Sequence, residues 1–312
     1  MTTCRAHARI GLVGNPSDGF FGKTISLSIA NFWAEVSVWP SARLRIVPHP
    51  LNDPTSFGSL ADLHGVVDKE GYAGGVRLLL AVCKKFHAMA AARGLSLPKR
   101  NFTMAYDTNV PRQVGLAGSS AILTAALKAL MAFYGLGDAQ MPKVSLPNFI
   151  LSVEKEELGI NAGLQDRVIQ VYEGAVHMDF DRAHMEAEGH GIYTLLPPAL
   201  LPPLWLAYLA DPSDSGRIHS TVRQKWDAGD VEVREGMREF GRITDDALAA
   251  IHASDAAALG RAMDANFATR RRLFGDPTLG EANLMMVGIA QRHGVPVKFP
   301  GSGGAVIGLC VG

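Results

Sequence analysis

The segment Pro111-Arg112-Gln113-Val114-Gly115-Leu116-Ala117-Gly118-Ser119-Ser120-Ala121 runs directly into an apolar stretch that predicts a helix over residues 119–134. Gly115 and Gly118 allow backbone N–H groups to approach a ligand closely. The start of the helix offers unpaired N–H donors and a partial positive charge, both of which suit a phosphate. The alternative is a serine-capped helix after a glycine turn. The segment is not a Walker A loop, because no Gly-Lys-Ser/Thr follows the glycines.

A second polar segment spans residues 154–167, at the end of a helix predicted over residues 147–158. It begins with the acidic run from Glu154 to Glu157 and ends with Asp166 in apolar surroundings. A carboxylate such as Asp166 can serve as a base or as a fixed negative charge. Glu154 can share a magnesium ion with a serine hydroxyl and phosphate oxygens. Taken alone, the segment is equally typical of a solvated acidic helix end.

A third segment, Gly301-Ser302-Gly303-Gly304, forms a predicted turn between strands over residues 297–299 and 305–311. None of the three segments is specific alone, but their order along the chain resembles the galactokinase, homoserine kinase, mevalonate kinase and phosphomevalonate kinase (GHMP) superfamily. Residues 111–121 resemble its phosphate loop, residues 8–18 its N-terminal substrate motif, and residues 301–304 its C-terminal glycine motif.

Within that superfamily, three motifs are most similar to those of plant and algal glucuronokinases. They are Gly14-Asn15-Pro16-Ser17-Asp18-Gly19, Asp107-Thr108-Asn109-Val110-Pro111-Arg112-Gln113 and Asp211-Pro212-Ser213-Asp214-Ser215-Gly216. The resemblance implies an α+β fold of two domains with the active site in the cleft. The N-terminal domain would hold a mixed sheet and span residues 1–196, and a ferredoxin-like C-terminal domain would span residues 197–312. The prolines among residues 195–203 also favour a boundary there, because proline interrupts helix interiors and central strands.

The resemblance also assigns roles to individual residues. Asp166 and Arg9 would be catalytic, and Ser120 and Glu154 would bind Mg²⁺, with Glu156 or Glu157 as alternatives to Glu154. The ATP-binding residues would be Pro111, Gly115, Leu116, Ala117, Gly118, Ser119, Ser120 and Ala121. The substrate-binding residues would be Asp18, Arg112, Arg167 and Gly303.

The implied reaction is ATP-dependent phosphorylation of D-glucuronate at its anomeric hydroxyl. The alternatives are L-arabinose or galactose as the substrate, or a non-catalytic sugar sensor. Asn15-Pro16 stands where galactokinases carry an acidic residue and a histidine, so their sugar contacts do not transfer to these two positions. The glucuronate carboxylate requires a cation, preferably arginine. The candidates are Arg112, Arg167 and the run Arg270-Arg271-Arg272, for which a solvated helix face is the alternative.

Thirty Lys and Arg residues balance thirty Asp and Glu residues, so net charge favours neither nucleic acid nor an anionic membrane. The three cysteines are far apart, which argues against a disulfide framework and favours the cytoplasm. The sequence has no Gly-x-Gly-x-x-Gly motif after an early strand, so it does not support a dinucleotide-dependent oxidoreductase. Family members usually continue beyond the last predicted strand with a helix and a strand. We therefore expect either that the C-terminus is trimmed or that the second sheet ends in an exposed edge, which can pair with another chain. The expected oligomeric state is a monomer or a homodimer.

Overall fold

The structure is a computed structural model that describes residues 1–70, 74–210 and 220–310 of the 312-residue chain. It contains both helices and strands, and the predicted α+β fold is confirmed. Contacts between residues divide the chain into two compact units. Unit 1 comprises Met1–Ala8, Ala30–Val110 and Ala117–Ala162; unit 2 comprises Arg9–Ile29, Pro111–Leu116 and Gly163–Gly312. The domain boundary after residue 196 stays a prediction.

Unit 1 combines part of a mixed sheet with helices. The C-terminal half of β2 (Lys23–Ser41) pairs antiparallel with β4 (Asn101–Thr108), and β3 (Arg45–Val47) pairs parallel with β4. The helices are α1 (Leu60–Glu70), α2 (Gly75–Ala92), α3 (Gly118–Tyr134) and α4 (Leu146–Ser152), with a short 3₁₀ turn (Lys143–Ser145) before α4. A π-helical segment (Val153–Glu157) follows α4. The single helix predicted over residues 147–158 therefore changes type at Val153.

α2 packs against α3. The structure buries Leu79, Val82 and Phe86, whereas Leu80 is 53% exposed. The buried residues of α2 thus recur at intervals of three and four positions, as on one face of an amphipathic helix.

Unit 2 contains the remainder of the first sheet. Residues 23–27 of β2 pair antiparallel with β5 (Ala175–Asp179), which pairs with β6 (Ile192–Leu196). β1 (Thr2–Val13) pairs with β2 and belongs to unit 2 from Arg9 onward. The short η1 (Ser17–Phe20) connects β1 to β2, and α5 (Gln165–Tyr172) precedes β5. The helix α6 (Arg182–Glu188) lies between β5 and β6.

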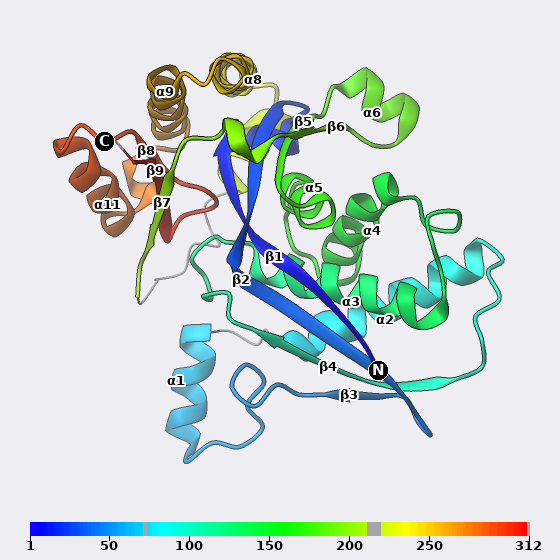
Figure 1. The fold of residues 1–312 in the computed structure, drawn as a ribbon. Helices are drawn as coiled ribbons and strands as arrows, with labels where there is room; N and C mark the ends of the chain where they lie inside the picture. The colour runs from blue at the N-terminus through cyan, green and yellow to red at the C-terminus, as the bar shows by residue number, and fades with distance from the viewer. Residues whose placement is uncertain (71–73, 211–219, 311–312) are drawn as a thin grey trace. The chain divides into compact units, whose positions relative to one another are not determined.

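The second sheet of unit 2 has the strand order β7 (Leu204–Tyr208), β9 (Ala305–Leu309), β8 (Val297–Lys298), with both pairings antiparallel. A 3₁₀ turn (Pro198–Leu200) precedes β7. The helices of this part are α7 (Ser220–Asp227), α8 (Val231–His252), α9 (Ala256–Phe274), α10 (Asp276–Leu279) and α11 (Glu281–Arg292). In Figure 1, α8 and α9 lie side by side, as their many contacts require.

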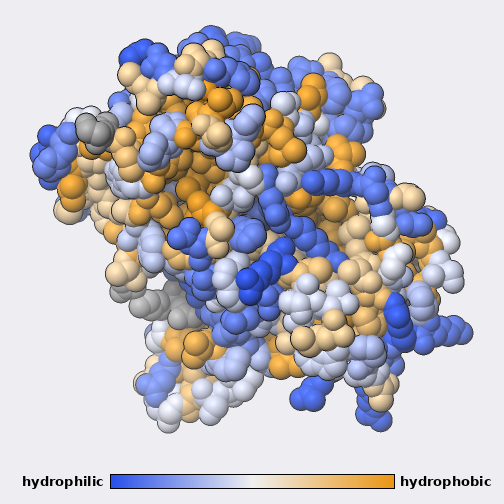
Figure 2. All heavy atoms as spheres, viewed as in Figure 1, coloured by the Kyte–Doolittle hydropathy of each residue, from blue (hydrophilic) through white to orange (hydrophobic). Residues whose placement is uncertain are grey.

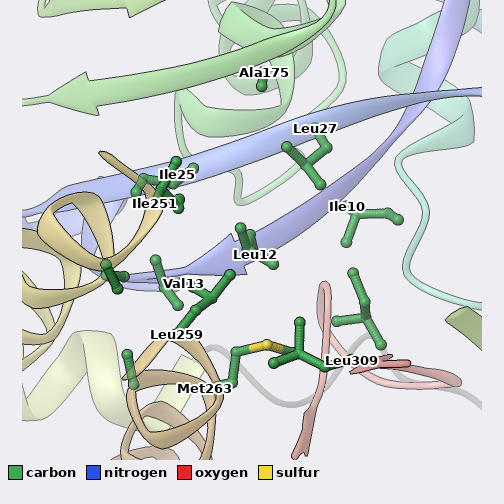
Figure 3. Packing of buried hydrophobic residues seen from close by; sticks show 14 of the residues in the cluster. Ile10, Leu12, Val13, Ile25, Leu27, Ala175, Ile251, Leu259, Met263 and Leu309 are labelled. Atoms are coloured by element: carbon green, nitrogen blue, oxygen red, sulfur yellow. The ribbon is translucent and has the colours of Figure 1, made fainter. Parts of the chain in front are cut away.

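A hydrophobic core in unit 2 fixes β1 against these helices. Figure 3 shows Leu12 and Val13 of β1 pointing toward Leu259 and Met263 of α9, and Ile10 belongs to the same cluster. Leu12 and Val13 are fully buried, and burial of each such side chain contributes about 1.5–3 kcal/mol. Because Arg9 directly precedes Ile10, this packing also fixes the backbone that carries the Arg9 side chain.

The face of the molecule drawn in Figure 2 carries both hydrophilic and hydrophobic residues. Among the helices that the structure describes, none combines the length and the apolar character needed to cross a membrane. The motif at residues 211–216 lies outside the described residues.

Candidate active site

Arg9 connects three segments of unit 2 through one guanidinium group. Its Nε donates a hydrogen bond of 2.5 Å to Oδ1 of Asp166. Its Nη1 donates to the carbonyl oxygens of Gly115 and Pro300, at 2.6 Å and 3.2 Å. The Arg9 side chain is only 7% exposed. The two residues predicted to be catalytic, Arg9 and Asp166, therefore lie in direct contact although 157 positions separate them.

Asp166 lies in the first turn of α5, where the partial positive charge of the helix start favours a carboxylate. Its Oδ2 lies 3.3 Å from the guanidinium of Arg167. Burial by itself would raise the pKa of Asp166, but the charges of Arg9 and Arg167 and the hydrogen bonds from Arg9 and Gln165 outweigh it and lower the pKa. Asp166 is therefore ionised at neutral pH.

Asp18 is the second carboxylate of the cluster and lies in η1. Its Oδ2 accepts a hydrogen bond of 3.2 Å from the backbone N–H of Gln165. A Cβ atom at Gly163 would lie 2.0 Å from the same oxygen, so any larger residue there would displace the Asp18 carboxylate. Burial, followed by the nearby negative charge of Asp166, raises the pKa of Asp18 to about 6. The cluster thus holds two carboxylates with different proton affinities.

Lys298 is a further residue of this region that was not predicted from the sequence. It is 1% exposed, and its Nζ donates to the carbonyl oxygens of Gly11 and Phe299 and to Oδ1 of Asn15, at 2.8, 2.8 and 2.6 Å. Burial, helped by the charges of Arg270 and Arg9, lowers the pKa of Lys298 well below its ordinary value. Three acceptors match the three N–H donors of an ammonium group. Lys298, which lies in β8, thereby binds Asn15 of the motif at residues 14–19.

The glycine turn at residues 301–304 packs against the first part of the predicted phosphate loop. A Cβ atom at Gly301 would lie 2.1 Å from the carbonyl oxygen of Gly115, and one at Gly304 would lie 2.7 Å from the Cα of Val114. Gly304 has a φ of +81°, and its N–H donates to Oδ1 of Asn283 at 2.8 Å. Glycine is needed here because the two segments approach backbone to backbone.

The rest of the phosphate loop lies in unit 1, at the start of α3. The helix begins after Ala117, which has a left-handed φ of 62° and provides no side-chain cap. The Ser120 hydroxyl is 1% exposed in the folded chain and donates to the Ala117 carbonyl oxygen at 3.1 Å, whereas Ser119 is exposed. Neither serine is the N-cap residue, so the serine-capped alternative is wrong. The side chains of Leu116 and Ala121 are buried, which leaves only their backbone for contact with a ligand.

Glu154 is fully buried in the π-helical segment of unit 1. Its two alternatives are bound elsewhere, since Glu156 pairs with Lys85 and Glu157 pairs with Lys84. Burial and these ion pairs therefore favour Glu154 as the metal ligand. A serine hydroxyl and a carboxylate are oxygen donors that fit Mg²⁺, which usually takes few protein ligands and keeps water and phosphate oxygens. The described residues contain no cluster of three or more His, Cys, Asp or Glu suited to a metal.

The arginines proposed for the substrate carboxylate have different surroundings. Arg167 is buried, and its Nη1 donates to the Gly163 carbonyl oxygen at 3.0 Å in addition to pairing with Asp166. Arg271 pairs with Asp276, and Arg272 pairs with Glu239, as the solvated-face alternative requires. Arg270 departs from that alternative because it is 1% exposed. Arg112 is exposed.

Comparisons with known proteins identify the family to which this chain belongs. The family model of the GHMP kinases N terminal domain matches residues 77–174. Glucuronokinase 1 and probable glucuronokinase 2 of Arabidopsis thaliana are 52% and 50% identical to this chain. Each alignment covers 98% of this chain and 84% or 83% of the relative. The crystal structure of Lactococcus lactis galactokinase complexed with galactose superposes with a TM-score of 0.73 at 16% identity, covering 99% of this chain and 85% of that one. This chain therefore belongs to the GHMP kinase family, together with the plant glucuronokinases.

Proposed function

We propose that the protein is an ATP-dependent kinase that phosphorylates D-glucuronate on its anomeric hydroxyl and forms D-glucuronate 1-phosphate. The substrate is supported by the two glucuronokinases of Arabidopsis thaliana, which match nearly the whole chain at about half identity. The chemistry is supported above all by one contact, the 2.5 Å hydrogen bond by which Arg9 holds Asp166. Membership of the family does not by itself identify the sugar, and the contact of Arg9 with Asp166 does not by itself identify the acceptor hydroxyl. The two observations together support the proposal.

In the proposed reaction the anomeric oxygen forms a bond to the γ-phosphorus of ATP as the bond to the β–γ bridging oxygen breaks. Asp166 accepts a hydrogen bond from the reacting hydroxyl and receives its proton late, because the transition state of phosphoryl transfer is loose. Its ionised state, maintained by Arg9 and Arg167, suits this role. Asp18 provides a second acceptor for sugar hydroxyls, and Arg9 keeps the Asp166 carboxylate in one orientation.

The phosphates of ATP bind, in this proposal, to the backbone amides at the start of α3. Without a side-chain cap at Ala117, the first N–H groups of the helix can donate to an anion. Ser120 and Glu154 would hold a magnesium ion, and such an ion supplies charge neutralisation at the β- and γ-phosphates. The cytoplasmic location and the monomeric or homodimeric state stay predictions.

The proposed substrate carries a carboxylate, and Arg112 is the candidate favoured by its exposure. Arg167 and Arg270 are buried, and Arg271 and Arg272 lie in α9, outside the three predicted motifs. The variant Arg112→Met should reduce the preference for glucuronate over galactose by about 10-fold or more, since a charged hydrogen bond contributes about 1.5–3 kcal/mol. An unchanged preference would exclude Arg112 as the carboxylate ligand.

The function is tested by offering the purified protein ATP, Mg²⁺ and, separately, D-glucuronate, D-galactose and L-arabinose, with ADP release measured for each. We expect glucuronate to give the highest kcat/KM. The product should show in ³¹P NMR a phosphorus coupled to the anomeric proton. A higher kcat/KM for galactose or arabinose would support the alternative substrate. Sugar binding by calorimetry without any ADP release would support the sensor.

A further inference from the structure

Arg270, Arg271 and Arg272 follow one another in α9 but differ in their surroundings. Arg271 and Arg272 are half-exposed and form ion pairs with Asp276 and Glu239. Arg270 is 1% exposed, and its guanidinium lies over the rings of Phe274 and Phe299, at 5.4 and 5.5 Å from their centroids. Burial of a charged group is costly and normally requires hydrogen-bond partners.

Those partners are the carbonyl oxygens of the glycine turn. Nη1 of Arg270 donates to Gly301 at 2.7 Å, and Nη2 donates to Ser302 at 3.3 Å. Burial, together with the nearby charge of Arg9, lowers the pKa of Arg270 to about 10, so the group still carries its charge at neutral pH. One side chain of α9 therefore fixes two successive carbonyl groups of the turn.

Arg9 holds the same turn from its other end. Its Nη1 donates both to Pro300, the residue before the turn, and to Gly115. Gly301 packs so closely that an added Cβ would lie 2.1 Å from the Gly115 oxygen and 2.8 Å from Nη1 of Arg9. A displacement of the turn must therefore move either Gly115 or the Arg9 guanidinium.

The Arg9 guanidinium is in turn the group that holds Asp166, through Nε at 2.5 Å. A continuous series of contacts thus leads from Arg270 through the glycine turn and Arg9 to the carboxylate. We propose that Arg270 is a positioning residue of the kinase reaction, which keeps Arg9 against Asp166 by holding the carbonyl groups of Gly301 and Ser302. The inference rests on the proposed function, because it takes Asp166 as the group that meets the acceptor hydroxyl.

The test compares Arg270→Lys with Arg271→Lys as the matched control. Lysine keeps the positive charge at position 270 but lacks the planar pair of donors that binds both carbonyl groups. We expect kcat of R270K to fall about 10- to 100-fold, because small misplacements of catalytic groups have effects of this size. The KM for glucuronate should change less than about threefold, since the contact of Asp18 with Gln165 does not involve Arg9. The control R271K should match the wild type, as Arg271 is exposed and bonded only to Asp276 among the described residues.

A second readout needs no substrate. Carboxyl ¹³C NMR, with the Asp166 signal assigned from the Asp166→Asn spectrum, reports the titration of this group in the ligand-free protein. Burial raises the pKa of Asp166 and Arg9 opposes that effect, so loosening Arg9 in R270K should move the titration midpoint upward by about half a pH unit or more. The shift must occur in a protein that retains a cooperative thermal transition.

Should R270K not fold, Gly301→Ala displaces the turn from its opposite face, and we expect the same upward shift. A midpoint that stays at the wild-type value in a folded R270K or G301A overturns the inference, even if kcat falls. A wild-type protein that phosphorylates no sugar would refute the proposed function instead, and the titration would still show whether Arg270 controls the contact between Arg9 and Asp166.

Discussion

The start of α5 and the turn η1 each place one carboxylate in the same cluster, yet the two carboxylates differ in pKa. Asp166, at the start of α5, lies between Arg9 and Arg167, and its pKa is lowered despite burial. Asp18, in η1, accepts a backbone hydrogen bond but has no direct ion pair among the described residues, and its pKa rises to about 6. Direct contact with arginine, more than burial, therefore decides which carboxylate stays ionised. Environments that separate the pKa values of two acids also separate their roles.

The largest effect is expected at Asp166. Replacement by Asn keeps the size of the side chain but removes the negative charge and the proton acceptor. We expect kcat to fall about 1,000-fold, the usual range for loss of a general base being 10²–10⁴. Steady-state ADP release measures it, with Asp227→Asn as a control at an exposed aspartate. A loss below about tenfold would assign Asp166 only an orienting role.

Asp18→Asn should act mainly on sugar binding. Asn can still accept one hydrogen bond from the N–H of Gln165, but it lacks the charge that strengthens contacts to sugar hydroxyls. We expect the KM for glucuronate to rise about 10- to 100-fold, with a smaller change in kcat. If kcat of D18N fell as far as in D166N while KM stayed constant, the two carboxylates would not have the separate roles assigned here.

The pH dependence should separate the two carboxylates further. Asp18 is ionised only above its raised pKa, so kcat/KM of the wild type should decline about tenfold per unit below pH of about 6. Asp166 stays ionised through that range, so its titration causes no further decline of kcat/KM there. The decline near pH 6 should be absent in D18N. A wild-type profile that is level down to about pH 5 would contradict a raised pKa at Asp18.

The smallest effects concern stability. Because the folded pKa of Asp18 is raised, the folded chain binds that proton more tightly than the unfolded chain, and stability falls as pH rises from about 4 through about 6. D18N stays neutral, so at pH 7 it should be more stable than the wild type by about 3 kcal/mol, from a rise of about two pKa units. The depressed pKa of Asp166 has the opposite sign, so its stabilisation is present above the unfolded pKa and lost on acidification.

Urea unfolding at several pH values measures both effects. The stability difference between D18N and the wild type should shrink as the pH falls to about 4 and should vanish well below it, where Asp18 is protonated in both the folded and the unfolded state. D166N should be less stable than the wild type at pH 7, and this difference should also shrink in acid. A D18N variant less stable than the wild type at pH 7 would mean that the Asp18 charge is stabilising in the folded chain.

The sequence predicted the segments of the site better than their contacts. The phosphate loop, Asp166 and the glycine turn were recognisable because their order along the chain resembles that of the GHMP kinases, although no one segment was specific alone. The contact of Arg9 with Asp166 joins residues 157 positions apart, and no periodicity reports such a distance. Gly163 is required only because the Asp18 carboxylate packs over it, so its role depends on folding of η1. The sites themselves stay predictions until variants are measured.

Two buried cations, Lys298 and Arg270, were not recognised as buried from the sequence. Lys298 stands alone in the apolar run Val295-Pro296-Val297-Lys298-Phe299-Pro300, which is the signal that could have identified it. Arg270 belongs to a run whose other two members are solvated, so composition could not distinguish it. The helix starts also differ in how well the sequence reports them. Asp230 and Asp255 cap α8 and α9, as the preference of aspartate for N-cap positions predicts. The start of α3 has no side-chain cap at Ala117.

The most direct test of the two different carboxylates is a carboxyl ¹³C NMR titration of the ligand-free wild type from about pH 5 to about pH 8. Spectra of D18N and D166N assign the two signals. We predict that the Asp18 carbon titrates with a midpoint of about 6, while the Asp166 carbon shows no titration of its own in this range. A midpoint near 6 for Asp166, with Asp18 already ionised at the acidic end, would contradict the assignment of roles.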